Sequence, residues 1–230
     1  MDIMLRDALR KYNGLRAQLD RNLLGDDGEE WERQLKKFLR KEPTWVAPAA
    51  SPLATNKPTL VLLKAVELGE VASKDTQQCM TGTHWCYRDS DIDRWLLKEQ
   101  PAVEAAPVGV YQLQKPAGTT FREMAQAALG TAREWSKDEL ATLLKKRGLI
   151  LTLPAVELMV ERQEAGEDVG LGTDGYANIA FLEDAEGFVS VLVVHRNGRQ
   201  WVAYVYRLGH GSRWGAGSRL LLRNSVTATL

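Results

Sequence analysis

Runs of β-branched and aromatic residues, separated by turn signals, dominate the chain from Tyr176 to Asn224. The runs over residues 176–182 and 188–194 flank a stretch that ends in Gly187, a pattern typical of a hairpin with a longer loop. Next, Asn197-Gly198 supplies the positive φ angles that a two-residue type I′ turn requires. The pattern predicts an antiparallel β-meander, with a shorter fourth strand at residues 220–222.

A type I′ turn at this position would place Arg196 opposite Arg199 and Val191 opposite Tyr204. Alternate residues of the two strands then fall on two faces, and both faces are apolar. We therefore expect helices on one face and another cover on the other, unless one face is an interface. The first face carries Val189, Val191, Val193, Val202, Tyr204 and Tyr206, and the second carries Phe188, Leu192, Val194, Trp201, Ala203 and Val205.

Three helices are predicted upstream of this meander. Thr120-x-x-Glu123 and Ser136-x-x-Glu139 are capping boxes, and Gly130 and Gly148 follow as helix stops. Pro154 suits the first turn of a third helix that runs to about residue 163. Earlier in the chain, residues 60–68 and 108–113 are predicted strands. Ser90 is the expected N-cap of a short helix that turns Ile92, Trp95 and Leu96 inward.

The N-terminal region shows helical rather than strand periodicity. Apolar residues recur every three or four positions over residues 2–24, and again over residues 29–41. Half of the eight prolines then fall within residues 43–58, which predicts an extended linker. The two helices form an expected helical hairpin over residues 1–42 whose apolar stripe is a candidate partner-binding surface: Leu5, Leu9, Tyr12, Leu19, Trp31 and Phe38.

These elements predict an α+β protein. Its expected parts are the helical hairpin at 1–42, the Pro/Ala linker at 43–58, a mixed α/β segment at 59–118, and three helices with the antiparallel sheet at 119–230.

The N-terminal sequence Gly28-Glu29-Glu30-Trp31, followed by KFLRKEPTW at 37–45, resembles a block found in uncharacterised bacterial hypothetical proteins. Residues 148–157 and the Gly175-Tyr176 step before a β-rich end resemble later parts of the same proteins. The resemblance covers about the first 45 residues and the segment from 148 onward. It implies the order of domains and a bacterial origin, and it implies no activity.

Charge is segregated near the C-terminus, although the chain as a whole has a net charge of zero. Residues 167–186 hold six acids and no Lys or Arg, and residues 187–230 hold six arginines and no acid. Arginine forks beside aromatic rings suit phosphate contact and base stacking. In the alternative interpretation, the acids pair with the arginines and the aromatics are core. The candidate nucleic-acid or anion site comprises Arg196, Arg199, Arg207, Arg213, Arg219, Trp201 and Trp214.

Motifs for metal or phosphate chemistry are incomplete. Cys79, His84 and Cys86 are three soft ligands without the fourth that zinc needs. The acidic run 89–93 resembles a calcium loop but has Arg94 where that loop needs glycine. The glycine-rich stretch 209–217 leads into a strand, whereas phosphate-cradling loops lead into a helix. The segment Gly130–Trp135 is longer than the turn of a winged-helix DNA-binding motif. We name no catalytic residue, metal ligand or cofactor.

The sequence lacks an apolar run long enough to span a membrane, and its charged N-terminus does not resemble a signal peptide, so a cytoplasmic location is expected. Three functional hypotheses follow. The first is a non-catalytic interaction or structural protein that binds an unknown protein partner or itself. The second is nucleic-acid or anion binding through the arginine and aromatic residues. The third is an enzyme of unrecognised type.

Overall fold

The computed structural model describes residues 59–114, 118–131 and 133–223, together with Glu29, Glu32, Leu35, Lys36 and Leu39. The chain divides into two compact units, Met1–Thr55 and Asn56–Leu230. In the first unit the five described residues are helical, as predicted for 29–41, and Lys36 pairs with Glu32 at 2.6 Å. The linker 43–58 and the candidate stripe lie outside the described residues: Leu5, Leu9, Tyr12, Leu19, Trp31 and Phe38.

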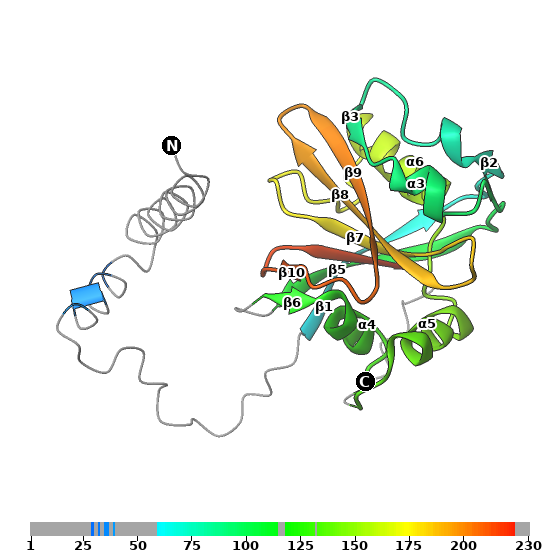
Figure 1. Cartoon of the computed structure of the whole chain (residues 1–230). Coiled ribbons are helices and arrows are strands. Elements are labelled where there is room, and N and C mark those ends of the chain that lie inside the picture. The colour runs from blue at the N-terminus through cyan, green and yellow to red at the C-terminus, as the bar shows by residue number, and fades with distance from the viewer. Residues whose placement is uncertain are drawn as a thin grey trace, which may run out of the picture. The chain divides into compact units, whose positions relative to one another are not determined.

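One mixed sheet of seven strands organises the second unit (Figure 1). The strand order is β1-β5-β11-β7-β8-β9-β3, and neighbours are antiparallel except for the parallel pairs β11–β7 and β9–β3. The α+β prediction is confirmed, and segments 59–118 and 119–230 contribute to the same sheet. Its strands are β1 (Thr59–Leu68), β3 (Trp85–Arg88), β5 (Ala106–Gln114), β7 (Asn178–Glu183), β8 (Val189–Asn197), β9 (Gln200–Arg207) and β11 (Arg219–Arg223).

Two short ladders flank this sheet. In one, β2 (Lys74–Asp75) pairs with β4 (Glu99–Gln100), next to the 3-10 helix η1 (Thr76–Gln78). In the other, β6 (Thr119–Thr120) pairs with β10 (Arg213–Trp214). This second ladder joins the glycine-rich connection 208–218 to the residues that directly precede the helix beginning at Phe121.

The β8–β9 hairpin forms as predicted, but in a different register. Asn197 pairs with Gln200, so Gly198 and Arg199 form the turn, and Arg196 lies opposite Trp201 rather than Arg199. Gly198 has a φ of 61° and takes the first central position, which a type II′ turn assigns to glycine. The prediction of a type I′ turn at Asn197-Gly198 was therefore wrong.

The observed register has a physical advantage. It separates two arginines whose direct opposition would cost about 0.2–1 kcal/mol. It also leaves Arg196 3.4 Å from Glu164 on a neighbouring helix. The shift moves each cross-strand partner by two residues, for example from Tyr204 to Tyr206 opposite Val191. Because side chains alternate with period two, the predicted faces are unchanged.

The fourth strand of the predicted meander does not lie next to β9. Instead, β11 lies between β5 and β7, antiparallel to the first and parallel to the second. The connection that follows β9 therefore carries the chain back across β8 and β7. The expectation of a purely antiparallel C-terminal sheet holds for β7, β8 and β9 only.

The described helices begin where their capping signals predict. In α4 (Phe121–Ala128) and α5 (Lys137–Lys146), both capping boxes are formed, and Gly130 and Gly148 follow with positive φ. The third predicted helix is α6 (Leu153–Glu164), with proline in its first turn. In α3 (Asp91–Trp95), the Ser90 side chain makes no capping bond; Asp89 accepts the Asp91 N–H at 3.0 Å instead.

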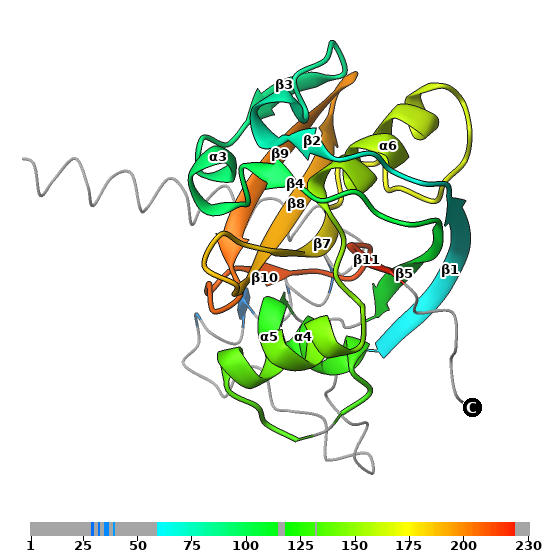
Figure 2. The same ribbon diagram turned by 90° about the vertical axis from the view of Figure 1, so that its right-hand side faces the viewer.

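Helices cover both faces of the sheet. Side chains of α4 and α5 pack with Ile179, Val191 and Leu220 on one face. Residues of α6 and of the segment around α3 pack with Leu192, Val194 and Ala203 on the other. Figure 2 shows α4 and α5 together on one side and α6 on the opposite side. The apolar pattern on both faces of the hairpin is thereby explained by two cores within the same unit.

Candidate functional site

A strip of aromatic and histidine rings extends over β8, β9 and β3 on the face that carries α4 and α5. Period-two alternation places Tyr204 and Tyr206 of β9 on this face, and the parallel pairing of β3 with β9 adds Tyr87 beside them. The connection after β9 adds two further rings. We call this surface the aromatic strip; it consists of Tyr87, His195, Tyr204, Tyr206, His210 and Trp214.

The rings of the strip are in mutual contact. The ring centroids of Tyr87 and Tyr204 are 5.0 Å apart, and those of Tyr204 and Tyr206 are 6.4 Å apart. His195 stacks on Tyr204 at 5.9 Å with an interplanar angle of 10°. His210 lies 4.9 Å from Tyr206. These separations are those of favourable aromatic pairs, so the rings support one another's orientation.

The strip lies where the helical layer ends. Phe121 at the start of α4 is fully buried against Tyr206 and Trp214, with centroid separations of 5.7 and 5.6 Å. Farther along β9, Tyr204 is only partly buried, and Tyr87 on the edge strand is 47% exposed. The β8–β9 hairpin extends away from α4 and α5 (Figure 1). This part of the sheet therefore leaves aromatic side chains partly exposed to solvent.

A carboxylate lies beside these rings. Asp89 follows Tyr87 by two residues, and its N–H donates to the Ala203 carbonyl at 2.9 Å, which continues the pairing between β3 and β9. Asp89 is therefore next to Tyr204 at the edge of the strip. Partial burial and then the charge of Asp89 raise the pKa of the Tyr87 hydroxyl above 10.0. Burial, Tyr204 and then Asp89 raise the pKa of Tyr206 in the same direction.

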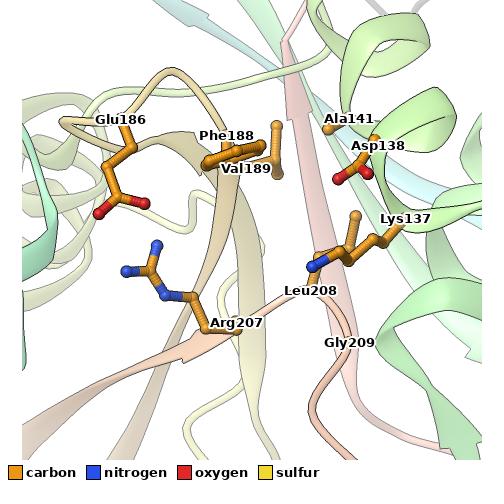
Figure 3. Close-up of a pocket in the computed structure, with 9 residues that line it drawn as sticks. All are labelled: Lys137, Asp138, Ala141, Glu186, Phe188, Val189, Arg207, Leu208 and Gly209. Carbon is orange, nitrogen blue, oxygen red and sulfur yellow. The ribbon is translucent and has the colours of Figure 1, made fainter.

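A pocket of about 240 Å³ lies next to the strip in the chain: Arg207, Leu208 and Gly209 line it, and His210 of the strip follows directly. It lies between the start of α5, the β7–β8 turn and the end of β9 (Figure 3). Phe188 and Val189 lie between two charged sides, with Glu186 and Arg207 reaching toward one another on one side and Lys137 and Asp138 on the other. Such a pocket suits one apolar group with polar atoms at its margin.

The candidate arginines do not form one surface. Arg196 lies 3.4 Å from the Glu164 carboxylate. Arg207 forms an ion pair with the fully buried Asp184 and stacks over Trp95 at 4.5 Å. Each guanidinium is held by a carboxylate of its own unit. The Arg207–Asp184 pair joins an arginine to the acids of residues 167–186, as the alternative interpretation predicts, whereas Glu164 lies outside that segment.

The remaining candidates differ in their surroundings. Arg219 donates to the Gly170 carbonyl, Arg213 donates to the Gly118 carbonyl at 3.2 Å, and Arg199 is exposed in the β8–β9 turn. Trp201 is fully buried, and its indole N–H donates to Glu164 at 2.9 Å, so its ring has no face open to solvent. Of the two candidate tryptophans, only Trp214 belongs to the aromatic strip.

The predicted soft ligands lie in different surroundings. Cys79 is buried and its thiol contacts the Asp75 carbonyl, whereas Cys86 is exposed and its thiol contacts the Trp201 carbonyl. Within the described ranges, no three His, Cys, Asp or Glu side chains are placed to hold a metal ion. The structure offers these residues no shared metal centre.

The two thiols are expected to differ in reactivity. Burial, and then the charge of Glu157, raise the pKa of the Cys79 thiol to about 11, and the thiolate is the reactive form. We expect one thiol of the native protein to react quickly with a disulfide reagent and the second to react only after denaturation. The Cys86→Ser variant should lose the fast reaction and Cys79→Ser should keep it. Fast reaction of both thiols in the native protein would contradict the buried position of Cys79.

His195 makes the folding stability depend on pH with a defined sign. Burial lowers its pKa below 6.5, so the folded protein binds the proton less readily than the unfolded chain. Its contribution to stability is fully present above pH 6.5 and is lost as the pH falls toward the folded pKa. We expect His195→Gln to lose less stability than wild type on acidification, measured by urea unfolding at about pH 7.5 and about pH 5. An equal loss in both proteins would contradict this expectation, and His84→Gln serves as an exposed control.

Exposed apolar side chains also occur on the other edge strand. Val61, Leu62 and Leu63 of β1 are each about 40% exposed, and the pairing of β1 with β5 shifts register between Leu62 and Lys64. An irregularity of this kind bends an edge strand and disfavours continued pairing with another strand. We therefore take the aromatic strip, with its pocket, as the stronger candidate site.

The fold and this surface define an α+β protein with a two-sided helical cover. No family model matches the chain, and no match was found among curated proteins or solved structures. The resemblance of the N-terminal block to bacterial hypothetical proteins therefore stays a prediction. In the ranges that the structure describes, no helix is long and apolar enough to cross a membrane.

Sequence reasoning found part of the strip. It assigned Tyr204 and Tyr206 to one face and named Trp214, but it did not connect Tyr87, Asp89 or either histidine with them. Alternation within β9 was a usable signal for the first two residues. The parallel pairing of β3 with β9 joins segments more than a hundred residues apart, and no local pattern encodes it.

Proposed function

We propose that this chain is a non-catalytic interaction protein and that its second unit binds a protein partner through the aromatic strip. The observation that carries the proposal is the uncovered part of the sheet, where the 47% exposed Tyr87 lies beside the partly buried Tyr204 and Tyr206. Exposed clusters of large aromatic side chains are typical of interaction sites.

The composition of the strip supports this role. Tyrosine and tryptophan offer large rigid contact areas at low cost in side-chain entropy, and they dominate the energetics of protein interfaces. Ring contacts with His195 and Tyr87 fix the orientation of Tyr204 before a partner arrives. The adjoining pocket offers room for an apolar anchor next to Phe188. A preorganised surface of this kind binds with a smaller ordering cost.

Nucleic-acid binding receives less support. Arg196 and Arg207 face carboxylates, and Trp201 has no exposed ring face. This alternative stays a prediction, as does an enzyme of unrecognised type.

The proposal can be tested with a displayed library of short peptides selected on the full chain. Enriched peptides should bind wild type and lose about tenfold or more in affinity for Tyr87→Ala/Tyr204→Ala, because aromatic anchors contribute about 1–2 kcal/mol or more each to interfaces. Affinity is measured by fluorescence anisotropy with labelled peptide.

Tyr176→Ala is the matched control, because this tyrosine is 48% exposed and lies outside the strip. It should bind the enriched peptides like wild type. A library that yields no binder, or binders that the double variant retains with unchanged affinity, would overturn the proposal. Circular dichroism of each variant separates loss of binding from loss of fold.

A further inference from the structure

We infer that the aromatic strip recognises its partner through a cationic side chain, an arginine or a lysine, held over Tyr87 and Tyr204 beside Asp89. The inference rests on the proposed function and adds the chemistry of the partner. The expected occupant of the strip is a basic segment of a protein.

The geometry of the rings suits a bound cation. Tyr87 and Tyr204 lie 5.0 Å apart with their planes inclined at 36°, and Tyr206 continues the row at 6.4 Å. A guanidinium or ammonium group placed over such faces is attracted by the ring quadrupoles. Among the described residues, arginines form cation–π contacts with Trp135 and Trp95, which lie outside the strip. No arginine or lysine of the described residues forms such a contact with Tyr87 or Tyr204.

The edge of the row carries negative charge. Asp89 is on the same face as Tyr87 by alternation, and its backbone bond to Ala203 fixes it beside β9. Its side chain accepts the Asp91 N–H, and among the described residues it forms no ion pair. Asp91 lies 3.8 Å from Arg94, whose side chain is largely exposed. The carboxylates at this edge therefore favour an incoming cation.

The same charges disfavour a phosphate. Burial lowers the pKa of His195, which stacks on Tyr204, and so disfavours a positive charge in the row. A polyanion stacked on Tyr87 and Tyr204 would bring its phosphates toward the Asp89 carboxylate. Aromatic faces next to a carboxylate are complementary to a basic side chain.

Asp89 also has a structural role at the start of α3, and the test must separate this role from the binding of a cation. Asp89→Asn keeps an oxygen that can accept the Asp91 N–H and removes only the charge. Asp174 provides a matched control, because its side chain accepts the N–H of Tyr176, also two residues onward. Asp174→Asn therefore makes the same chemical change in the same kind of turn, away from the strip.

The probe is a pentapeptide with a central arginine, compared with the same peptide carrying citrulline, its neutral isostere. The full chain is titrated with each peptide, and binding is followed by NMR through tyrosine ring signals. The arginine peptide should bind about fivefold or more tightly than the citrulline peptide, since a cation–π contact and an exposed charge pair act together. Asp89→Asn should weaken arginine binding about twofold to fivefold, and Asp174→Asn should leave it unchanged.

Equal binding of the two peptides, or no detectable binding of either, would overturn the cationic specificity. So would an Asp89→Asn variant that binds arginine like wild type. Library peptides that require Tyr87 and Tyr204 but contain no basic residue would overturn this inference and leave the proposed function standing. A single-stranded oligonucleotide that binds wild type and is lost in Tyr87→Ala/Tyr204→Ala would overturn both.

Discussion

Replacing Asp184 with alanine is expected to lower the free energy of unfolding by about 4 kcal/mol, a value set by the loss of a buried, multiply bonded carboxylate. Asp184 is fully buried in the turn between β7 and β8. Its Oδ1 accepts the N–H groups of Glu186 and Phe188 at 3.0 and 2.8 Å. Its Oδ2 accepts the Ser190 hydroxyl at 3.4 Å and the Arg207 guanidinium.

The ion pair itself is a minor part of this effect. The Arg207 side chain is 42% exposed, so water replaces much of what the pair provides. The larger cost comes from donors that lose their acceptor, namely the N–H groups of Glu186 and Phe188 and the buried Ser190 hydroxyl on β8. Because Phe188 and Arg207 line the pocket, the turn also positions one side of the candidate site.

Urea unfolding of Asp184→Ala measures the effect, and Glu186→Ala in the same turn is the exposed control. The control should change stability by less than about 0.5 kcal/mol. The stability loss of Asp184→Asn should lie between those of Asp184→Ala and Glu186→Ala, since the asparagine amide oxygen can still accept hydrogen bonds but the side chain has no charge. A loss below about 1 kcal/mol in Asp184→Ala would contradict the role of this carboxylate as the centre of the turn.

The second large effect is expected at Glu157. Replacing this residue with alanine should lower the free energy of unfolding by about 3 kcal/mol. This side chain of α6 is 5% exposed and reaches the segment between β2 and β3. It accepts the Lys74 ammonium at 2.6 Å and the Met80 N–H at 2.6 Å. Met80 is fully buried and has a φ of 57°, the only positive value for a non-glycine among the described residues. Glu157 therefore holds a strained backbone position in place.

The pH dependence of this pair has a defined sign. Burial lowers the pKa of Lys74, but the hydrogen bond and the charge of Glu157 outweigh it, and the net shift is upward from 10.5. The stabilisation is therefore fully present below pH 10.5 and is lost as the pH rises through the folded pKa. The difference in unfolding free energy between wild type and Lys74→Met should narrow above that pH.

Glu161→Ala on the same helix serves as an exposed control for Glu157→Ala. Both variants are compared with wild type by denaturant unfolding near neutral pH, and the control should remain close to wild type. If the two variants lose similar amounts of stability, the buried contacts of Glu157 do not stabilise the fold.

Local signals in the sequence predicted most elements of the second unit. The capping boxes at Thr120 and Ser136 and the glycines at 130 and 148 act within a few residues, and the structure contains each of them. The two apolar faces of the hairpin could also be predicted from the sequence, because the alternation of side chains within a strand does not depend on the partner strand. The α+β class follows from these elements.

The sequence did not predict which distant segments pair with one another, or in which register. Asn197-Gly198 favours a type I′ turn by itself, yet the observed register separates Arg196 from Arg199 and brings Arg196 to Glu164 on α6. The position of β11 between β5 and β7 likewise depends on pairing across the whole unit. The aromatic strip has the same origin, since Tyr87 joins β9 only through the parallel pairing of β3.

The most direct test of the account is to locate a bound peptide on the chain. NMR of protein carrying ring-labelled tyrosine, assigned with single Tyr→Phe variants, would follow a titration with a peptide enriched on wild type. The account predicts that the ring signals of Tyr87, Tyr204 and Tyr206 shift together with one affinity, while Tyr111 and Tyr176 stay unchanged. Shifts confined to Tyr111 or Tyr176, with the three strip tyrosines unaffected, would contradict the claim that the uncovered aromatic part of the sheet is the binding surface.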